Sequence, residues 1–167
     1  VLRLSMLDTP GYADFYGQVV AATSVADAAV VAVDATAGVQ VGTVRAWKRC
    51  EALNLPRAIV VTGLDKENAD FDGTVAALQD VWGARCEVVT FPTADKKGVV
   101  DALSTTGGKA DEIRAKLTDV AAESSDALIE KVLGGETLTA DELSGGLRAS
   151  VAQAKFIPIF AVMARQS

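Results

Sequence analysis

The sequence predicts an α/β domain with a mostly parallel sheet flanked by helices. Short apolar runs rich in Val are typical of buried parallel strands. A strand followed by a polar loop and an amphipathic helix recurs three times. Half of the 167 residues are apolar, which is enough for a sizeable core. Such units cross over with a right hand, so their strands lie parallel and ligands bind at the carboxyl ends of the strands.

The first part of the chain carries the recurring units. Apolar and polar residues alternate from residue 2, so we expect a strand over residues 2–7 and a turn at 8–11. Apolar runs too short for a helix predict three more strands, over residues 28–33, 58–61 and 86–91. Apolar residues at three- and four-residue steps predict helices that connect them, over residues 13–25, 41–53 and 71–82.

The pattern changes after Phe91. Residues 93–109 are polar and rich in Gly, and they predict a loop or a reduced insertion. Three elements are expected after this segment: one long amphipathic helix, a helix that begins at a capping box and a final strand, over residues 111–133, 139–154 and 156–162. The chain thus predicts a mostly helical insertion before the last strand.

Composition argues against several classes of protein. The formal charge of −6, from 16 basic and 22 acidic residues, argues against a domain that binds nucleic acid directly and with sequence specificity. The chain has two cysteines and no histidine, which argues against a Cys/His metal site and is typical of a reduced cytoplasmic protein. No apolar run reaches the ~18–20 residues that span a bilayer, so we expect no contact with a membrane.

A DxxG motif, Asp8-Thr9-Pro10-Gly11, follows the first predicted strand. In phosphate-binding α/β domains, an acidic residue at this point can hold Mg²⁺ through water, and the Gly lets a backbone N–H approach a γ-phosphate. Asp and Gly are also ordinary turn residues. The motif taken alone leaves both interpretations open.

A second polar loop, Thr62-Gly63-Leu64-Asp65, follows the predicted strand at 58–61. A carboxylate just past a strand end could accept hydrogen bonds from the N1–H and the N2 amine of guanine. An Asp in a loop is also a common turn or helix-capping residue. The loop taken alone therefore does not decide between base recognition and a structural role.

Taken together, the motifs resemble the GTP-binding domain of elongation factor G and its paralogues. The similar segments are the second switch (residues 7–15), a VDAxxGV run (33–40) and the guanine loop with the residues after it (64–71). They also include the helical part of an insertion (133–143) and the last strand (156–159). The resemblance runs from about residue 2 to residue 164, with the segments in the family's order. Small GTPases lack both the run at 67–71 and the helical insertion.

The resemblance implies a P-loop NTPase-like domain that binds GTP or GDP with Mg²⁺ and hydrolyses GTP, and a full-length protein that works on the cytoplasmic ribosome. It implies a partial GTP-binding domain at 1–92, an insertion at 93–155, and the last strand with the final nucleotide loop at 156–167. It implies that Asp8 holds Mg²⁺ through water and that Tyr12 is catalytic. It assigns nucleotide binding to Asp8, Thr9, Pro10, Gly11, Thr62, Gly63, Leu64, Asp65, Met163 and Ala164.

The chain departs from the family's pattern at both loops. The family's guanine loop is Asn-Lys-x-Asp, whereas this chain has Thr62 and Gly63 at the first two positions. Elongation factor G has His after DxxG, and this chain has Tyr12, a residue that some paralogues share. A phenol with a pKa of about 10 is a poor base near neutral pH, so Tyr12 indicates a slow or differently triggered enzyme, or else a packing residue. Val162 and Met163 replace the Gly-Ser of the last loop.

The phosphate-binding motif GxxxxGK[ST] is not found in these 167 residues. Gly107-Gly108-Lys109 lacks the preceding strand and the spacing of that motif, and its composition is that of a polar loop. We expect the phosphate loop upstream of Val1, a sheet incomplete at its N-terminal side, and little GTP affinity in this piece alone. The alternative is a degenerate domain that no longer binds nucleotide and serves as a docking module.

Overall fold

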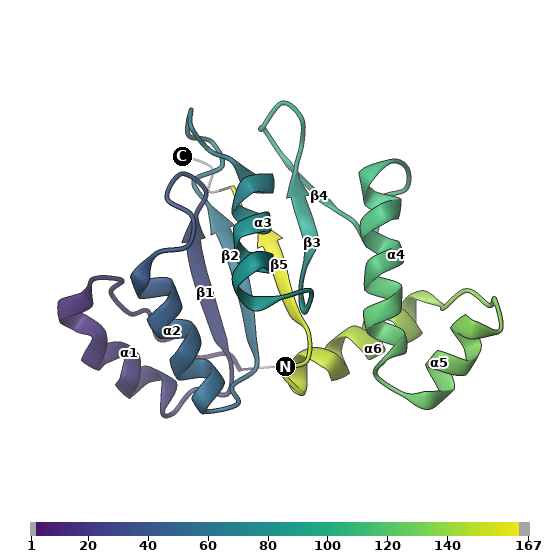
Figure 1. Cartoon of the computed structure of the whole chain (residues 1–167), viewed down its shortest axis with the longest axis horizontal. Helices are drawn as coiled ribbons and strands as arrows, with labels where there is room; N and C mark the ends of the chain where they lie inside the picture. Colours follow the sequence, from purple (N-terminus) through teal and green to yellow (C-terminus); the bar gives the residue numbers. More distant parts are fainter. Residues whose placement is uncertain (1–2, 164–167) are drawn as a thin grey trace.

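A five-stranded sheet forms the centre of the computed structural model, which describes residues 3–163 (Figure 1). Its strands are β1 (Ala29–Asp34), β2 (Arg57–Thr62), β3 (Cys86–Pro92), β4 (Val99–Asp101) and β5 (Ile157–Ala161). Their spatial order is β1-β2-β5-β3-β4; all neighbours pair in parallel except β4, which runs antiparallel to β3. The predicted mostly parallel sheet is confirmed, and the last strand of the chain lies inside it.

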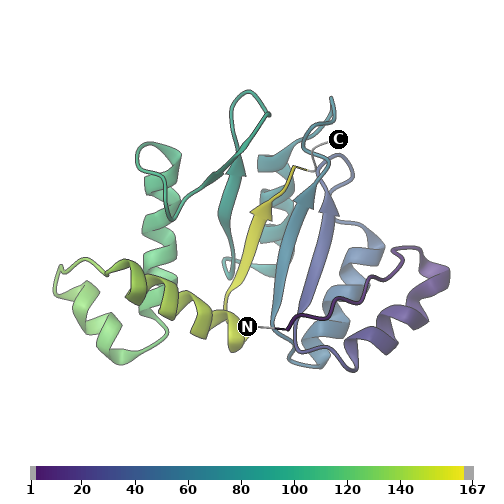
Figure 2. The ribbon, with the colours of Figure 1, turned by 180° about the vertical axis from the view of Figure 1, so that it is seen from behind.

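Helices connect the strands. They are the 3₁₀ helix η1 (Ala13–Phe15) and the α-helices α1 (Tyr16–Thr23), α2 (Val41–Ala52), α3 (Phe71–Trp82), α4 (Lys109–Ala122), α5 (Asp126–Leu133) and α6 (Ala140–Ala152). Helices α2 and α3 lie in front of the sheet, α1 lies beside α2, and α4 to α6 form a group beyond β3 (Figure 1). Figure 2 shows the opposite face, on which β1 and β2 are open to view. The strand–helix alternation predicted from residue 28 onward and the helical insertion before β5 are therefore confirmed.

The core lies between the sheet and its helices. Ile59 and Val61 of β2 and Ile159 of β5 are completely buried. Leu78 of α3 and Leu117 of α4 are completely buried as well. Burial of one such side chain contributes about 1.5–3 kcal/mol relative to leaving it exposed. The central strands are thus stabilised by contacts with the neighbouring strands and with the covering helices. The loops at their carboxyl ends therefore start from a rigid base.

Two stacked indoles join α2 to α3 at the amino end of β2. The ring centroids of Trp47 and Trp82 lie 4.1 Å apart with 16° between their planes. The guanidinium carbon of Arg57, a buried residue, lies 4.4 Å from the centroid of the Trp47 ring. A cation over an indole face is electrostatically favourable, while burial lowers the pKa of the Arg57 guanidinium. This cluster fixes α2, and thereby the loop that precedes it.

The predicted capping box at the start of α6 is confirmed. The Glu142 N–H donates to Thr139 Oγ1 over 3.2 Å, and the Thr139 N–H donates to Glu142 Oε2 over 2.8 Å. Lys131 Nζ of α5 lies 2.7 Å from Glu142 Oε1. Hydrogen bonding from Lys131 is the main cause that lowers the pKa of Glu142 to about 2. The carboxylate therefore both caps α6 and connects it to α5.

The strand predicted over residues 2–7 is wrong for the described residues 3–7, which form no regular structure. A strand needs a partner for its backbone hydrogen bonds, and β1 pairs within residues 3–163 with β2 alone. Leu4 and Met6 are consequently 77% and 85% exposed.

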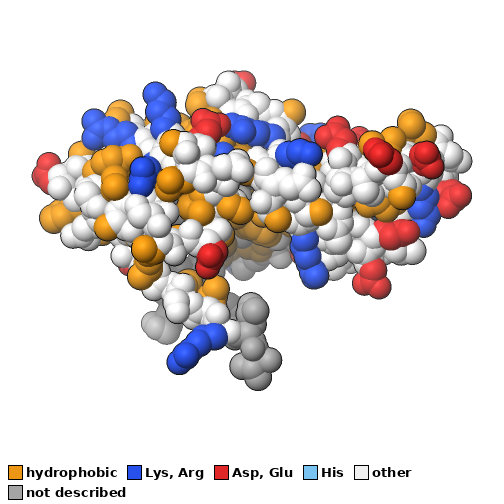
Figure 3. All heavy atoms as spheres, turned by 90° about the horizontal axis from the view of Figure 1, so that it is seen from below, with side chains coloured by type: hydrophobic (Ala, Val, Ile, Leu, Met, Phe, Trp, Pro, Cys, Tyr) orange, Lys and Arg blue, Asp and Glu red, His pale blue; other side chains and the backbone are white. Residues whose placement is uncertain are grey.

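Apolar side chains gather on the α1 side of the face shown in Figure 3, whereas acidic side chains gather at its α5 end.

The single long helix predicted over residues 111–133 is also wrong. Two helices, α4 and α5, occupy this range. Ser125 is the N-cap of α5, and its hydroxyl accepts a hydrogen bond from the Leu128 N–H. A Ser side chain at such a site satisfies a free N–H of a new first turn, so it favours a helix start over a helix interior. Strand β4 likewise lies within the segment at 93–109, for which the sequence predicts only a loop or a reduced insertion.

Candidate functional site

Three loops converge at the carboxyl ends of β1, β2 and β5. The register pairs Asp34 of β1 with Thr62 of β2. One residue further on, the Ala35 N–H donates to the Thr62 carbonyl over 2.9 Å. The Val162 N–H, just after β5, donates to the Val61 carbonyl over 3.0 Å. The loops that follow the three strands are therefore tied together by backbone hydrogen bonds.

The loop after β2 is a tight turn that presents Asp65. The Lys66 N–H donates to the Gly63 carbonyl over 3.2 Å and closes the turn. Gly63 has a φ of +69°, in the left-handed region that Gly enters without a steric penalty. Leu64 is 2% exposed and anchors the turn in the core, whereas Asp65 is exposed. The turn thus holds a carboxylate at the surface on a buried anchor.

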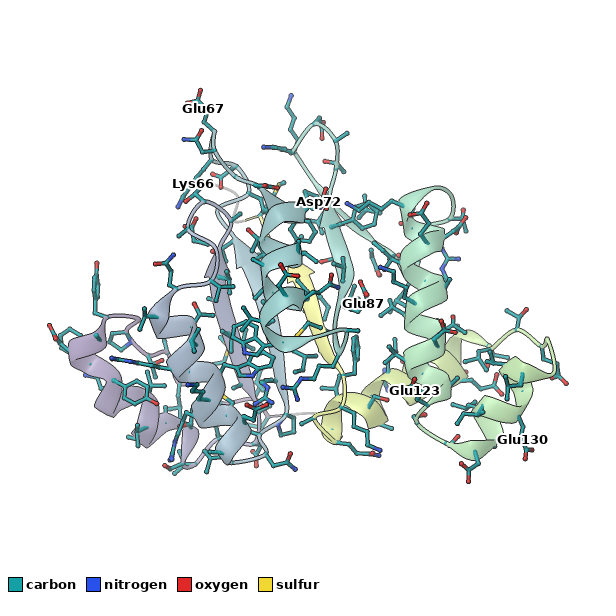
Figure 4. All side chains as sticks on the ribbon, in the orientation of Figure 1. Lys66, Glu67, Asp72, Glu87, Glu123 and Glu130 are labelled. Atoms are coloured by element: carbon teal, nitrogen blue, oxygen red, sulfur yellow. The ribbon has the colours of Figure 1, made fainter. Side chains whose placement is uncertain are left out.

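Asp34 is the most strongly hydrogen-bonded carboxylate of this region. Its Oδ1 accepts from the Thr36 N–H over 2.8 Å and from the Thr36 hydroxyl over 2.6 Å. Its Oδ2 lies 2.5 Å from Lys66 Nζ. The hydrogen bond from Lys66, followed by those from Thr36, holds the pKa of the Asp34 carboxyl well below its usual range. The Lys66 ammonium, labelled in Figure 4, thereby connects the loop after β2 to the loop after β1.

The contacts around Gly63 explain a departure that the sequence left open. A Cβ at this position would lie 3.2 Å from both carboxylate oxygens of Asp34 and 3.2 Å from Cε of Lys66. The left-handed φ would strain any other residue further. In this arrangement Gly63 leaves room for Asp34 and Lys66. Both residues lie in segments that resemble the family, but nothing in the sequence alone shows that they meet.

The DxxG segment approaches the start of α2 but is not hydrogen-bonded to these three loops within the described residues. Asp8 and Gly11 are in irregular structure, and Asp8 and Thr9 line a shallow hollow of about 360 Å³ against α1. Gly42 lies in the first turn of α2, and a Cβ added to it would lie 3.4 Å from the Gly11 carbonyl oxygen. Among residues 3–163, hydrogen bonds join the β1, β2 and β5 loops, but none joins residues 8–12 to them. The two predicted halves of the site are thus not joined by hydrogen bonds within the described residues.

Helix α1, which follows the DxxG segment, is attached to α2. Arg49 Nε donates to Thr23 Oγ1 over 3.3 Å, and Arg49 Nη2 donates to Ser24 Oγ over 2.9 Å. Tyr12, at the N-cap of η1, has a side chain 79% exposed. Tyr12 is therefore not packed into the core of the described residues, and its role stays a prediction. The phenol is instead presented to solvent next to the DxxG motif.

The last predicted loop is described in part. Met163 is half-buried against the core beside the end of β5, while Ala164 lies outside the described residues. Gly107 and Gly108 precede α4, and Lys109 Nζ lies 2.7 Å from Asp72 Oδ1 on α3, the latter labelled in Figure 4. Lys109 thus serves as an ion-pair partner between two helices, in agreement with a structural role for that segment.

Neither a membrane-spanning helix nor a clustered metal site is found among residues 3–163. None of the described helices is long and apolar enough to cross a membrane. Within the same residues, no group of three or more His, Cys, Asp or Glu side chains is arranged to hold a metal ion.

Comparison with known proteins agrees with the geometry. The model of the family described as the elongation factor Tu GTP binding domain matches residues 2–166. A crystal structure of a protein from Thermus thermophilus is similar, with 31% sequence identity and a TM-score of 0.83 over 93% of this chain. The chain spans 26% of the length of that protein. The chain belongs to the family of the elongation factor Tu GTP binding domain, and it is a translational GTPase domain.

Proposed function

We propose that this domain selects guanine nucleotides and hydrolyses GTP within an elongation factor G-like protein that acts on the cytoplasmic ribosome. The observation that supports this most is the exposed Asp65 on an anchored turn, at the carboxyl ends of three strands tied together by hydrogen bonds. Ligands of open α/β sheets bind at this edge. Residues 93–155 would form an insertion between a partial GTP-binding domain at 1–92 and its last strand and loop at 156–167.

The proposed base site uses the loops after β2 and β5. The Asp65 carboxylate accepts hydrogen bonds from the N1–H and the N2 amine of guanine, whereas adenine has no matching pair of donors. Leu64 anchors the loop, and its neighbours Thr62 and Gly63 shape the surface beneath the base. Met163 and Ala164 complete the site from the loop after β5.

The proposed phosphate site uses the DxxG segment. Mg²⁺ keeps several of its waters and binds proteins through one or two carboxylates together with substrate phosphates. The single exposed carboxylate of Asp8 fits such water-mediated binding. A bound Mg²⁺ would neutralise part of the phosphate charge during hydrolysis. Thr9 and Pro10 connect Asp8 to Gly11, whose N–H would donate to the γ-phosphate.

Tyr12 is proposed as the catalytic residue that orients the attacking water. Its exposed phenol can donate to and accept from water, and it directly follows the DxxG motif proposed for the phosphate side, which supports this role. A phenol hydroxyl can hold a water by hydrogen bonds but is a poor general base near neutral pH. The proposal therefore implies slow intrinsic hydrolysis, with Tyr12 positioning the water and not deprotonating it.

Replacement of Asp8 tests the phosphate site. In the full-length protein that contains this chain, Asp8→Ala should lower kcat/KM for GTP by about 10- to 100-fold, the usual cost of disturbing the shell around a bound metal. Asp14→Ala is a matched control, since Asp14 is an exposed carboxylate of the adjoining η1 helix. GTP turnover should be measured over a Mg²⁺ titration. Unchanged kinetics of Asp8→Ala would refute the role given to Asp8.

A domain that has lost nucleotide binding and serves as a docking module is the second candidate. The observation that favours it is the departure from the family's guanine loop at Thr62 and Gly63. Full-length protein that binds neither GTP nor ATP would support the docking module. Equal binding of both nucleotides would show instead that guanine selectivity has been lost.

A further inference from the structure

The turn that carries Asp65 is held at three points. Leu64 is buried beneath it. The Lys66 N–H closes it by donating to the Gly63 carbonyl over 3.2 Å. The third point is the ion pair between Lys66 Nζ and Asp34 Oδ2, at 2.5 Å, which joins residues 32 positions apart in sequence. Loss of this pair would free the side of the turn next to Asp65.

The partner of Lys66 is itself fixed in place. The Asp34 carboxylate uses Oδ1 for the N–H and the hydroxyl of Thr36, which leaves Oδ2 to Lys66. Asp34 is the last residue of β1 and is paired in register with Thr62, so its backbone belongs to the rigid sheet. The Lys66 ammonium is therefore attached to a carboxylate that does not move with the turn.

The ion pair also affects the charge around Asp65. Lys66 is the next residue in the chain, and its flexible ammonium could otherwise associate with the Asp65 carboxylate. Among residues 3–163, Asp65 takes part in no ion pair, whereas Lys66 is bound to Asp34. A carboxylate without an internal partner keeps both oxygens available for a ligand. Pairing with Asp34 thus removes a competing cation from the exposed Asp65.

We propose that Lys66 and Asp34 act together as positioning residues for base recognition, and we call them the Asp34–Lys66 clamp. The clamp fixes the Gly63–Lys66 turn to the end of β1 and keeps the Lys66 ammonium away from Asp65. Gly63 is part of the device, since a Cβ there would lie 3.2 Å from the Asp34 oxygens and from Lys66 Cε. This inference rests on the proposed guanine-binding function and names the residues that position its base-reading carboxylate.

The test compares the affinities for GDP and ADP of the full-length protein that contains this chain, by isothermal titration calorimetry in Mg²⁺ buffer. Lys66→Met keeps an unbranched side chain of similar size and removes the charge, and Asp34→Asn keeps the size of its partner. Each variant should bind GDP about two- to fivefold more weakly, the effect expected of one solvent-exposed ion pair. ADP affinity should stay unchanged, so that the GDP/ADP selectivity falls by the same factor.

Two further variants separate positioning from a general structural role. Lys66→Arg restores a cation and should recover most of the selectivity. Lys97→Met removes an exposed lysine of the loop between β3 and β4 and should keep the full GDP/ADP selectivity. The melting temperature of each variant, followed by tryptophan fluorescence, shows how far stability has changed.

The outcomes distinguish this inference from the proposed function. A wild-type protein that prefers GDP, together with Lys66→Met and Asp34→Asn variants of unchanged selectivity, would overturn the clamp alone. An equal loss of GDP and ADP affinity with a lower melting temperature would also overturn it, because that is the signature of a merely structural pair. A wild-type protein that shows no preference for GDP would overturn the proposed function and the clamp with it.

Discussion

Gly146→Ala should destabilise the domain by about 1–3 kcal/mol, the usual cost of inserting a methyl group into a packed contact. Gly146 is buried where α6 packs on α4. A Cβ at this position would lie 2.6 Å from the Ala121 carbonyl oxygen and 2.9 Å from the Ala121 Cβ. Neither atom can turn away as a long side chain could, so the two helices must separate. Urea denaturation of the purified chain measures the change in the free energy of unfolding.

Gly145→Ala is the matched control for this prediction. Gly145 precedes Gly146 in the same helix, but a Cβ there has no atom within 4 Å. An Ala in a helix interior is favoured over Gly by roughly 0.5–1 kcal/mol, so this variant should be more stable than the wild type. Changes of opposite sign in the free energy of unfolding for the two adjacent glycines would demonstrate the α4–α6 contact. Equal effects of the two substitutions would contradict the packing described for α6.

Asp65→Ala should lower the affinity for GDP by at least about 100-fold and leave the affinity for ADP unchanged. The proposed carboxylate accepts two hydrogen bonds from guanine, and each bond to a charged group contributes about 1.5–3 kcal/mol. A factor of 100 in affinity corresponds to about 2.8 kcal/mol, within reach of the two bonds. The measurement is calorimetric titration of the full-length protein with each nucleotide. Because Asp65 is exposed, its replacement should change the melting temperature little.

The control for Asp65→Ala is Glu67→Ala. Glu67 is an exposed acidic residue two positions further along the same loop, and its side chain extends away from the fold in Figure 4. Its removal changes the net charge by the same amount and should leave GDP affinity within about twofold, since exposed charges interact weakly through water. An equal effect of the two substitutions would show that the site responds to overall charge and does not use Asp65 for base recognition.

Most of the fold could be predicted because its signals are local. The Val-rich runs that form β1, β2 and β3 pair within the sheet as short apolar strands should. The boundary between α4 and α5 could not be predicted because the apolar spacing continues across Ser125, whose capping role depends on one hydrogen bond. Strand β4 could not be predicted because its three residues are held by pairing with β3 and by no pattern of their own.

Only part of the arrangement of the candidate site could be predicted. Asp65 lies just past the end of β2, as its motif predicts, whereas no strand precedes Asp8 among the described residues. The functional roles of both residues stay predictions. The ion pair between Asp34 and Lys66 joins residues 32 positions apart and depends on the register of β1 against β2. Neither the register nor the left-handed φ of Gly63 can be read from the sequence. From the sequence alone, Gly63 is therefore interpreted only as the loss of the side chain that the family has at this position.

The most direct test of the central claim is a calorimetric titration of the full-length protein that contains this chain, with GDP and with ADP in the presence of Mg²⁺. We predict that GDP binds at least about 100-fold more tightly than ADP, because only guanine offers both donors that the Asp65 carboxylate can accept. Equal binding of the two nucleotides, or binding of neither, would contradict the account of this domain as a guanine-selective GTPase.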